Sequence, residues 1–205
     1  GGVAAFGRHL DAALFAYKAE LFAEEIVAPA AGPAAARTAK ASLLRAAEAL
    51  RGAPARLAHR DLQSANVHVR PGRPAGRRLC LIDLQGALLA PPEYDLVCLL
   101  RDSYVELEWS EVLRLVERVR PQLPDAPSRE ECAARFDLLT LLRKGKDLAR
   151  FVHVARTRGD LRYLRFAPAT VRGLRAAAQR SAARDAGLSD LAEIALGLPE
   201  DACAR

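Results

Sequence analysis

The polar segment at residues 59–66, with the sequence HRDLQSAN, constrains this chain of 205 residues more than any other feature. It lies directly before two short runs with an alternating pattern, at residues 67–70 and 79–82. Alternation with a period of two is typical of β-strands, and the residues between the runs (71–76, PGRPAG) are turn formers. The sequence therefore predicts a small β-hairpin with the polar segment before its first strand and Asp83 after its second.

The order of polar residues in this hairpin indicates a particular chemistry. Residues 59–66 match the pattern H-R-D-x-x-x-x-N, which is found in the catalytic loop of kinases. In that arrangement Asp61 accepts or orients the proton of a substrate hydroxyl, and Asn66 turns back to a metal ion on the nucleotide phosphates. Asp83 follows an apolar run that we expect to be a buried strand, where a carboxylate is costly unless it binds something. The principal magnesium ligand of a kinase has this position.

Each of these residues alone has a plainer interpretation. His59 could be an ordinary core histidine, and Asp83 could be a turn carboxylate that accepts backbone N–H groups. The order and spacing of all of them together favour the kinase interpretation. Within it, we expect His59 to anchor the loop structurally rather than to carry a proton.

The rest of the chain has the pattern of α-helices. Apolar residues recur at helical spacing, and much of the apolar content is alanine, a strong helix former. The predicted helices are 8–27, 34–50, 93–105, 110–119, 129–156, 168–186 and 189–196, with a break at 28–33. Ser110 and Ser128 are expected N-caps. With no internal repeat, the predicted fold class is α+β and mainly helical, one domain around the hairpin, which is the only β element we expect.

The stretch from His59 to Tyr104 resembles the aminoglycoside phosphotransferase/choline kinase superfamily. Within it, residues 82–87 (IDLQGA), Pro91, 94–96 (YDL) and 99–102 (LLRD) are similar to bacterial anomeric sugar kinases. Members of that branch phosphorylate N-acetylmuramate and N-acetylglucosamine at the anomeric hydroxyl during cell-wall recycling. The resemblance implies a protein-kinase-like C-terminal lobe in which the hairpin carries the catalytic loop.

Matching the family's motifs residue by residue implies a set of site residues. Asp61 is then the catalytic base, and Asn66 and Asp83 are the Mg²⁺ ligands, with ATP as co-substrate. His59 and Asp95 hold the catalytic loop. Three further residues are candidates for contact with substrate or transferred phosphate: Arg60, Gln85 and Arg101. The chain departs from the family pattern at several positions, among them Cys98, where serine is usual.

The resemblance also implies a domain organisation. Residues 1–205 correspond to the C-terminal lobe, with the catalytic loop at 57–70, the metal segment at 79–87 and a helical remainder at 93–196. Nothing before His59 resembles the strand lysine and phosphate-covering loop of a nucleotide-binding lobe. We therefore expect that lobe to be absent and the isolated chain to bind ATP poorly.

Composition limits the partners. The formal net charge is +6, from 31 Lys and Arg against 25 Asp and Glu, but aromatic residues make up only 5% of the chain. Scattered arginines without aromatic residues to stack on bases favour solvated helix faces over a nucleic-acid partner.

Four cysteines without a CxxC pair predict neither a zinc site nor a disulfide framework. No apolar run approaches the ~20 residues needed to cross a bilayer, and we expect a cytoplasmic protein without a membrane partner.

The acceptor remains open between several small alcohols. Aminoglycosides are polycations and suit an acidic pocket, whereas an acidic sugar such as N-acetylmuramate suits the basic balance of this chain better. Choline is a third candidate acceptor. A kinase-like module without catalysis is the alternative of a different class, although the intact Asp61, Asn66 and Asp83 argue against it. The sequence does not indicate an oligomeric state.

Overall fold

The computed structural model describes residues 7–200. The chain divides into two compact units, one formed by Gly1–Leu10 and Ala53–Cys132 and the other by Asp11–Gly52 and Ala133–Arg205. The structure is mainly helical with two small antiparallel sheets, in agreement with the predicted fold class. Within the described residues, no helix combines the length and the apolar character needed to cross a bilayer.

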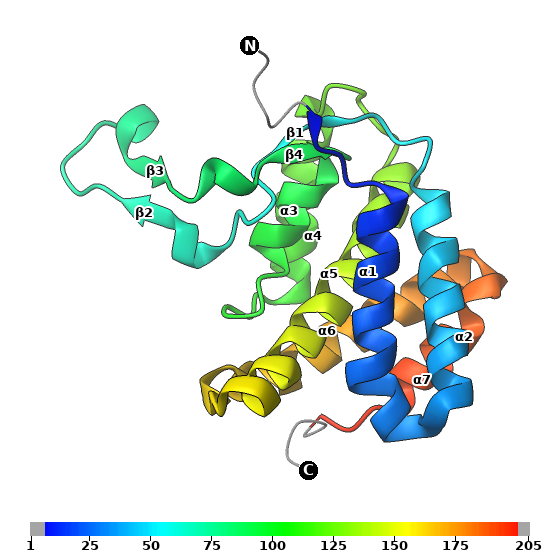
Figure 1. The fold of residues 1–205 in the computed structure, drawn as a ribbon. Helices are drawn as coiled ribbons and strands as arrows, with labels where there is room; N and C mark the ends of the chain where they lie inside the picture. Colours follow the sequence, from blue (N-terminus) through cyan, green and yellow to red (C-terminus); the bar gives the residue numbers. More distant parts are fainter. Residues whose placement is uncertain (1–6, 201–205) are drawn as a thin grey trace. The chain divides into compact units, whose positions relative to one another are not determined.

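The first unit contains both sheets (Figure 1). Strands β2 (Val67–Val69) and β3 (Leu79–Leu81) form the predicted hairpin, in a register that places Val67 opposite Leu81. A second sheet, which we did not predict, pairs β1 (Arg56–Ala58) with β4 (Leu88–Ala90). The two polar segments of the site, residues 59–66 and 82–87, are the connections between these two sheets. The hairpin is therefore held at its open end by a second pair of strands.

The β2–β3 hairpin is exposed rather than buried. Val69, Leu79 and Ile82 are 62%, 60% and 43% exposed, and Asp83 is also exposed. The prediction of a buried strand before Asp83 was therefore wrong. The apolar pattern of three residues is compatible with either face of a hairpin, and only neighbouring elements decide whether that face is covered. The cost of burial consequently gives no argument for a metal at Asp83.

Three helices follow the strands of the first unit. Helix α3 (Glu93–Leu100) is shorter than predicted, because Arg101 leaves helical geometry (φ −116°, ψ 31°). Helix α4 (Trp109–Val119) begins after Glu108, so Ser110 is not its N-cap. At the start of α5 (Arg129–Arg158) the Ser128 hydroxyl accepts from the Glu131 amide and the Glu131 carboxylate accepts from the Ser128 amide. This reciprocal capping box confirms the predicted helix start at Ser128.

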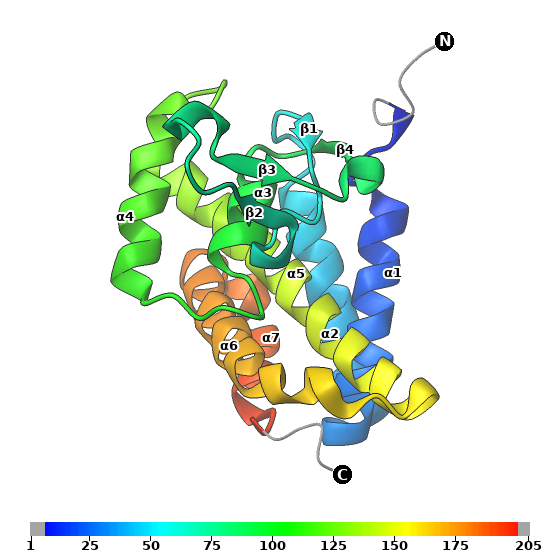
Figure 2. The ribbon, with the colours of Figure 1, turned by 90° about the vertical axis from the view of Figure 1, so that its left-hand side faces the viewer.

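The second unit opens with two helices that lie side by side (Figures 1 and 2). Helix α1 (Ala12–Phe22) continues through a π-helical turn (Ala23–Val27) into α2 (Ala28–Ala49). The predicted break is present but narrow, because only Gly32 leaves helical geometry, with φ 85°. A positive φ costs glycine little, so Gly32 lets the chain bend between the helices.

The remaining helices of the second unit are the main part of α5, then α6 (Ala167–Arg184) and α7 (Ser189–Gly197). Helix α7 packs on α2 and on α6, and α5 approaches α1 at Phe22. The buried core of these helices is mostly aliphatic, with Leu142 and Leu174, and it includes the rings of Phe136 and Phe151. Gly145 of α5 faces Phe22, since a Cβ on Gly145 would lie 3.3 Å from the Phe22 ring. The absence of a side chain there allows α5 and the phenylalanine to approach closely.

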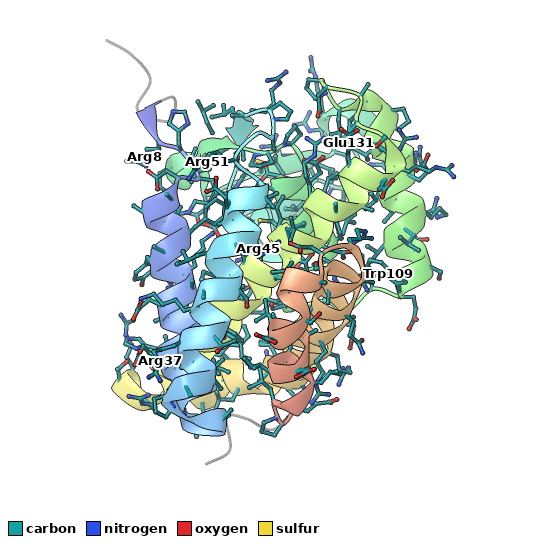
Figure 3. All side chains as sticks on the ribbon, turned by 90° about the vertical axis from the view of Figure 1, so that its right-hand side faces the viewer. Arg8, Arg37, Arg45, Arg51, Trp109 and Glu131 are labelled. Atoms are coloured by element: carbon teal, nitrogen blue, oxygen red, sulfur yellow. The ribbon has the colours of Figure 1, made fainter. Side chains whose placement is uncertain are left out.

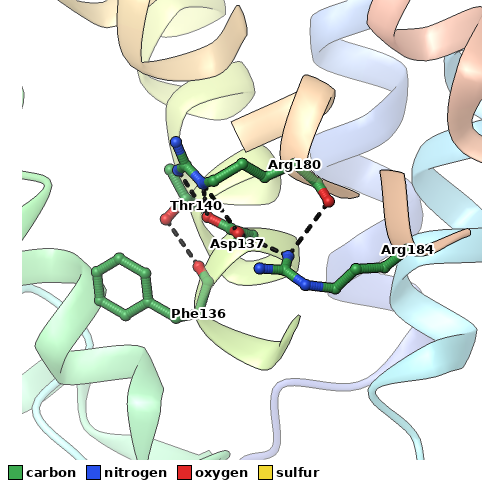
Figure 4. A network of polar contacts seen from close by, with 5 residues as sticks. All are labelled: Phe136, Asp137, Thr140, Arg180 and Arg184. Carbon is green, nitrogen blue, oxygen red and sulfur yellow. Dashed lines mark hydrogen bonds and ion pairs between the residues drawn. The ribbon is translucent and has the colours of Figure 1, made fainter. Parts of the chain in front are cut away.

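Most of the positive charge of the second unit is on solvated helix surfaces, as predicted. Arg37 and Arg45 project from α2, and Arg51 follows it (Figure 3). The Arg45 guanidinium donates to Asp185 at 2.8 Å, which holds the pKa of that carboxyl below its usual value. Asp137, which is buried, accepts from Arg180 at 2.7 Å and from Arg184 at 2.8 Å (Figure 4). These pairs connect α2 and α5 to the C-terminal helices.

Candidate active site

The site is built around residues 59–66, which we call the 59–66 loop, between strands β1 and β2. His59 is buried, and its Nε2 lies 2.8 Å from the carbonyl oxygen of Ile82 at the end of β3. The other ring nitrogen, Nδ1, is buried and makes no hydrogen bond. A ring enclosed in this way ties the start of the loop to the end of the hairpin, and it is shielded from any substrate in solution.

Asp61 and Asn66 are joined by a side-chain contact. The Asn66 Nδ2 donates to the Asp61 carbonyl at 2.8 Å, and the Gln63 amide donates to the same carbonyl at 2.9 Å. The amide nitrogen of Asn66 is thereby committed to the loop, and its Oδ1 is left as an acceptor pointing away from that bond. The carboxylate of Asp61 is half-buried.

Asp83 adjoins the same loop through the backbone. The Ile82 amide donates to the Asn66 carbonyl at 3.1 Å, so the residues after β3 lie beside the end of the loop. Asp83 has a left-handed backbone (φ 68°, ψ 40°), a conformation that costs a non-glycine residue roughly 1–2 kcal/mol. Its carboxylate accepts a hydrogen bond from the Gln85 side chain. Strain of this kind concentrates at functional sites.

The turn after Asp83 packs against the loop at Gly86. A Cβ on Gly86 would lie 3.7 Å from the Asp61 Oδ2 and 3.6 Å from the Arg60 Cδ. The turn at Gly86 and the loop therefore meet within van der Waals distance, with the Asp61 carboxylate and the Arg60 side chain at the contact. Arg8 also contacts this turn, because its guanidinium donates to the Gln85 carbonyl at 3.0 Å. Sequence patterns gave no signal for Arg8, since the bond joins positions far apart in the chain.

Helix α3 holds the start of the loop. Both oxygens of Asp95 accept backbone amides, from His59 at 2.7 Å and from Arg60 at 3.0 Å. The thiol of Cys98, one turn further along the helix, donates to the Arg60 carbonyl at 3.1 Å. Arg60 needs these restraints because its φ is +75°. Cys98 occupies the position where the resembling family has serine, and either side chain can donate this bond.

Arg101, the last of the predicted contact residues, lies against a different side chain. Its guanidinium carbon is 5.5 Å from the centroid of the Trp109 ring, at the distance of a cation–π interaction. Arg60 and Gln85, by contrast, adjoin Asp61 and Asp83 directly. Arg60 and Gln85 thus lie next to the proposed base and the proposed metal ligand Asp83, and a contact of Arg101 with substrate stays a prediction.

The oxygen atoms of the site suit a hard divalent cation. Asp61 and Asp83 provide carboxylates and Asn66 an amide oxygen, and these are the ligand types that Mg²⁺ prefers. Among residues 7–200, no three His, Cys, Asp or Glu side chains gather into a metal-binding group. A metal at this site would therefore be held by few protein ligands, as is usual for Mg²⁺ that also binds substrate phosphates.

Comparison with known proteins places the chain in a class. Residues 4–119, more than half of the chain, match the phosphotransferase enzyme family, and the chain belongs to that family. Among its relatives is the N-acetylmuramate/N-acetylglucosamine kinase of Pseudomonas aeruginosa PAO1, which is 28% identical over 149 residues. The kinase of the same name from Neisseria meningitidis MC58 is 45% identical over 60 residues.

The two matches cover different shares of the proteins. The alignment with the Pseudomonas kinase covers 70% of this chain and 41% of that relative. The alignment with the Neisseria kinase covers 29% of this chain and 16% of the relative. The matched part of this chain therefore spans about two fifths of the Pseudomonas kinase and about one sixth of the Neisseria kinase. Membership of the predicted family is confirmed, and the substrate is a matter for proposal.

Proposed function

We propose that this chain carries the phosphoryl-transfer site of an ATP- and Mg²⁺-dependent kinase that acts on a hydroxyl of a small molecule. The proposed acceptor is an amino sugar, N-acetylmuramate or N-acetylglucosamine, phosphorylated at its anomeric hydroxyl in cell-wall recycling. The observation that carries the proposal is the junction of the 59–66 loop with the end of β3, where the Ile82 amide donates to the Asn66 carbonyl. That bond brings the proposed base and both proposed metal ligands to one end of the hairpin.

In this proposal the side chains have separate tasks. Asp61 accepts the proton of the sugar hydroxyl as its oxygen attacks the γ-phosphorus of ATP, and ADP leaves with the electrons of the broken P–O bond. Asn66 and Asp83 hold Mg²⁺, which neutralises negative charge on the phosphate oxygens when bound. His59, Asp95 and Cys98 keep the loop in place. Arg60, beside the Asp61 carboxylate at Gly86, is placed to contact an anionic group of the substrate or the phosphate.

The amino-sugar acceptor is supported by the names of the two relatives and by charge. A lactyl carboxylate, which N-acetylmuramate has, is complementary to a basic protein, and a polycationic aminoglycoside is not. Choline is disfavoured by the same argument. A cytoplasmic location is part of the proposal, because ATP is the co-substrate and the described cysteines Cys80, Cys98 and Cys132 are free thiols.

A chimera tests the proposal in a complete kinase. The chain replaces the segment of the Pseudomonas kinase to which it aligns, and the chain alone is assayed in parallel. Transfer of ³²P from ATP is measured with N-acetylmuramate, N-acetylglucosamine, choline and kanamycin as acceptors. We expect the two sugars to be phosphorylated by the chimera, and the Asp61→Asn variant to lower kcat by about 10²–10⁴, the contribution of a general base. Asp83→Asn should raise the Mg²⁺ concentration needed for half-maximal rate.

Glu108→Gln is the matched control, because it removes one exposed carboxylate from the same unit and should leave the rate unchanged. Full activity of the Asp61→Asn chimera would contradict the assigned base. A folded chimera that transfers phosphate to none of the acceptors would favour a non-catalytic module, and preference for kanamycin or choline would replace the amino sugar.

A further inference from the structure

We propose that Asp102 is a positioning residue for the active site, acting through the Ser64–Asn66 turn on the metal ligand Asn66. The inference rests on the proposed function, since it assigns a role relative to that metal site. Asp102 was part of the family resemblance only as the last residue of the segment 99–102. Its contacts give it a specific task.

Asp102 is a buried carboxylate whose two oxygens are both occupied by backbone N–H groups. Asp102 is 6% exposed. The Oδ2 accepts from the Ser64 amide at 2.7 Å, and the Oδ1 accepts from the Tyr104 amide at 2.9 Å. One oxygen thus holds the 59–66 loop, and the other holds the chain just after α3. Hydrogen bonds to a charged acceptor are about twice as strong as neutral ones.

The hydrogen bond from the loop to Asp102 starts at Ser64, the first residue of a short 3₁₀ turn. Ser64–Asn66 forms that turn, and the preceding residue, Gln63, supplies no side-chain cap. An uncapped turn of three residues has little stability of its own. The Asp102 carboxylate takes the place of the cap, because it accepts the first N–H of the turn from outside the loop. The orientation of Asn66 consequently depends on it.

Loss of the Asp102 bond would affect both Asn66 and Asp61. Asn66 is the last residue of the turn, and its side chain donates to the Asp61 carbonyl at 2.8 Å. Displacement of the turn would move the amide that we assign to the metal and release the carbonyl beside the proposed base. Outer residues of this kind orient metal ligands, and their loss typically weakens metal binding about 10–100-fold.

The three side chains that hold the loop come from α3 and the residue pair that follows it. Asp95 and Cys98 lie one turn apart on α3, and Asp102 lies just after the helix, beyond Arg101. Asp95 and Cys98 fix the backbone at residues 59 and 60, and Asp102 fixes it at residue 64. Asp95 and Cys98 on α3 and Asp102 just after it therefore restrain both ends of the loop, and with them the separation of the proposed base and Asn66.

Two substitutions remove the same bond from opposite sides. Asp102→Asn keeps the shape of the side chain, but its amide can accept only one of the two N–H groups and directs a donor at the other. Ser64→Pro removes the N–H itself. Proline is tolerated at the first position of a helical turn, and Gln63 (φ −113°, ψ 164°) already has the extended backbone that a following proline requires. Glu108→Gln is the charge-matched control.

Two measurements on the 205-residue chain compare these variants with the wild type. Amide hydrogen exchange at residues 65 and 66, which keep their N–H in both variants, reports the order of the turn. Water-proton relaxation reports binding of Mn²⁺ alone, as a paramagnetic substitute for Mg²⁺. We expect both variants to exchange at least about tenfold faster in this turn, as loss of one charged hydrogen bond implies. We expect Mn²⁺ affinity to fall about tenfold or more. The double variant should be no worse than the more severe single variant, because both remove one bond.

The outcomes separate the inference from the proposed function. Unchanged exchange in both folded variants overturns the inference. Faster exchange with unchanged Mn²⁺ affinity overturns it too, because the turn would then be ordered by Asp102 without positioning a metal ligand. If the wild-type chain binds Mn²⁺ no better than Asp83→Asn does, the proposed metal site itself fails. Exchange then decides alone whether Asp102 orders the turn.

Discussion

Carboxylates that are buried or half-buried occur in both units of the molecule, but they bond to different groups. In the first unit, Asp95 and Asp102 accept backbone N–H groups of the 59–66 loop. In the second, Asp137 and Asp147 accept from arginine or lysine side chains on helices. A carboxylate that binds backbone amides fixes the path of a loop, whereas one that binds cationic side chains neutralises charge between packed helices.

The difference predicts a separation of effects. Loss of a loop carboxylate should disturb local order and the proposed chemistry more than global stability, since few apolar contacts change. Loss of a helix carboxylate should lower the free energy of unfolding and leave the loop as it was. The three predictions below test this separation, from the largest expected effect to the smallest.

Asp137→Asn should give the largest loss of stability. The Asp137 side chain is 3% exposed and forms ion pairs with Arg180 and Arg184. Asparagine is neutral, so the substitution removes the negative charge that the two arginines share. Breaking a buried ion pair costs roughly 3–5 kcal/mol, and we expect about 3 because both arginines are partly exposed and can be hydrated. Urea unfolding followed by circular dichroism measures the change.

Glu193→Gln, which removes an exposed carboxylate from α7, is the control and should alter stability by less than about 0.5 kcal/mol. Hydrogen exchange at residues 64–66 should be the same in Asp137→Asn as in the wild type. A stability loss confined to the loop, or faster exchange there without global destabilisation, would contradict the separation.

The pH dependence of folding stability tests the same comparison at Asp147. Burial raises the pKa of this carboxyl, but Lys146, Arg143 and Lys144 outweigh burial and hold the pKa well below its ordinary value of 3.8. A pKa that is depressed in the folded state stabilises the fold above the unfolded pKa, and that stability is lost as pH falls through the folded pKa. Stability should therefore decline below about pH 4.

Asp147→Asn should lose about 2 kcal/mol at pH 7, the worth of a hydrogen bond to a charged group, and less as the pH is lowered. Urea titrations of wild type and variant at several pH values give the difference. A difference between the two proteins that stays constant from pH 7 to about pH 2 would show that Asp147 acts by packing rather than by charge.

The helices were the most predictable part of the fold, because their signals are local. The helical periodicity of residues 129–156 and the Ser128 cap located α5 to within two residues. The β1–β4 sheet was missed, since each strand has three residues and its partner lies about thirty positions away. Exposure of the hairpin was also misjudged, because a run of three residues does not say what covers it. Non-local pairing and burial are set by tertiary packing, which short patterns do not contain.

At the site, the motif identified the residues but not the contacts that hold them. Asp61, Asn66 and Asp83 could be chosen from spacing, and their assigned roles are predictions that the chimera tests. Arg8 carried no signal at all. Asp102 lies beyond the end of α3, so helical spacing from Asp95 does not locate it. Its bond to the Ser64 amide joins positions 38 residues apart, which a local pattern does not contain.

Cys98 gives the smallest expected effect in this comparison, because the hydrogen bond from its thiol to the loop is a weak one. Its thiol donates to the carbonyl of Arg60, a residue with positive φ that α3 holds in place. Cys98→Ser replaces a weak S–H donor by a stronger hydroxyl at nearly the same position and should slow exchange in residues 60–61 or leave it unchanged. Cys98→Ala removes the donor and should cost about 1 kcal/mol, measured by urea unfolding, with faster exchange in the same residues. Equal exchange in the serine and alanine variants would mean that Cys98 contributes volume only, and that the carboxylates alone restrain the loop.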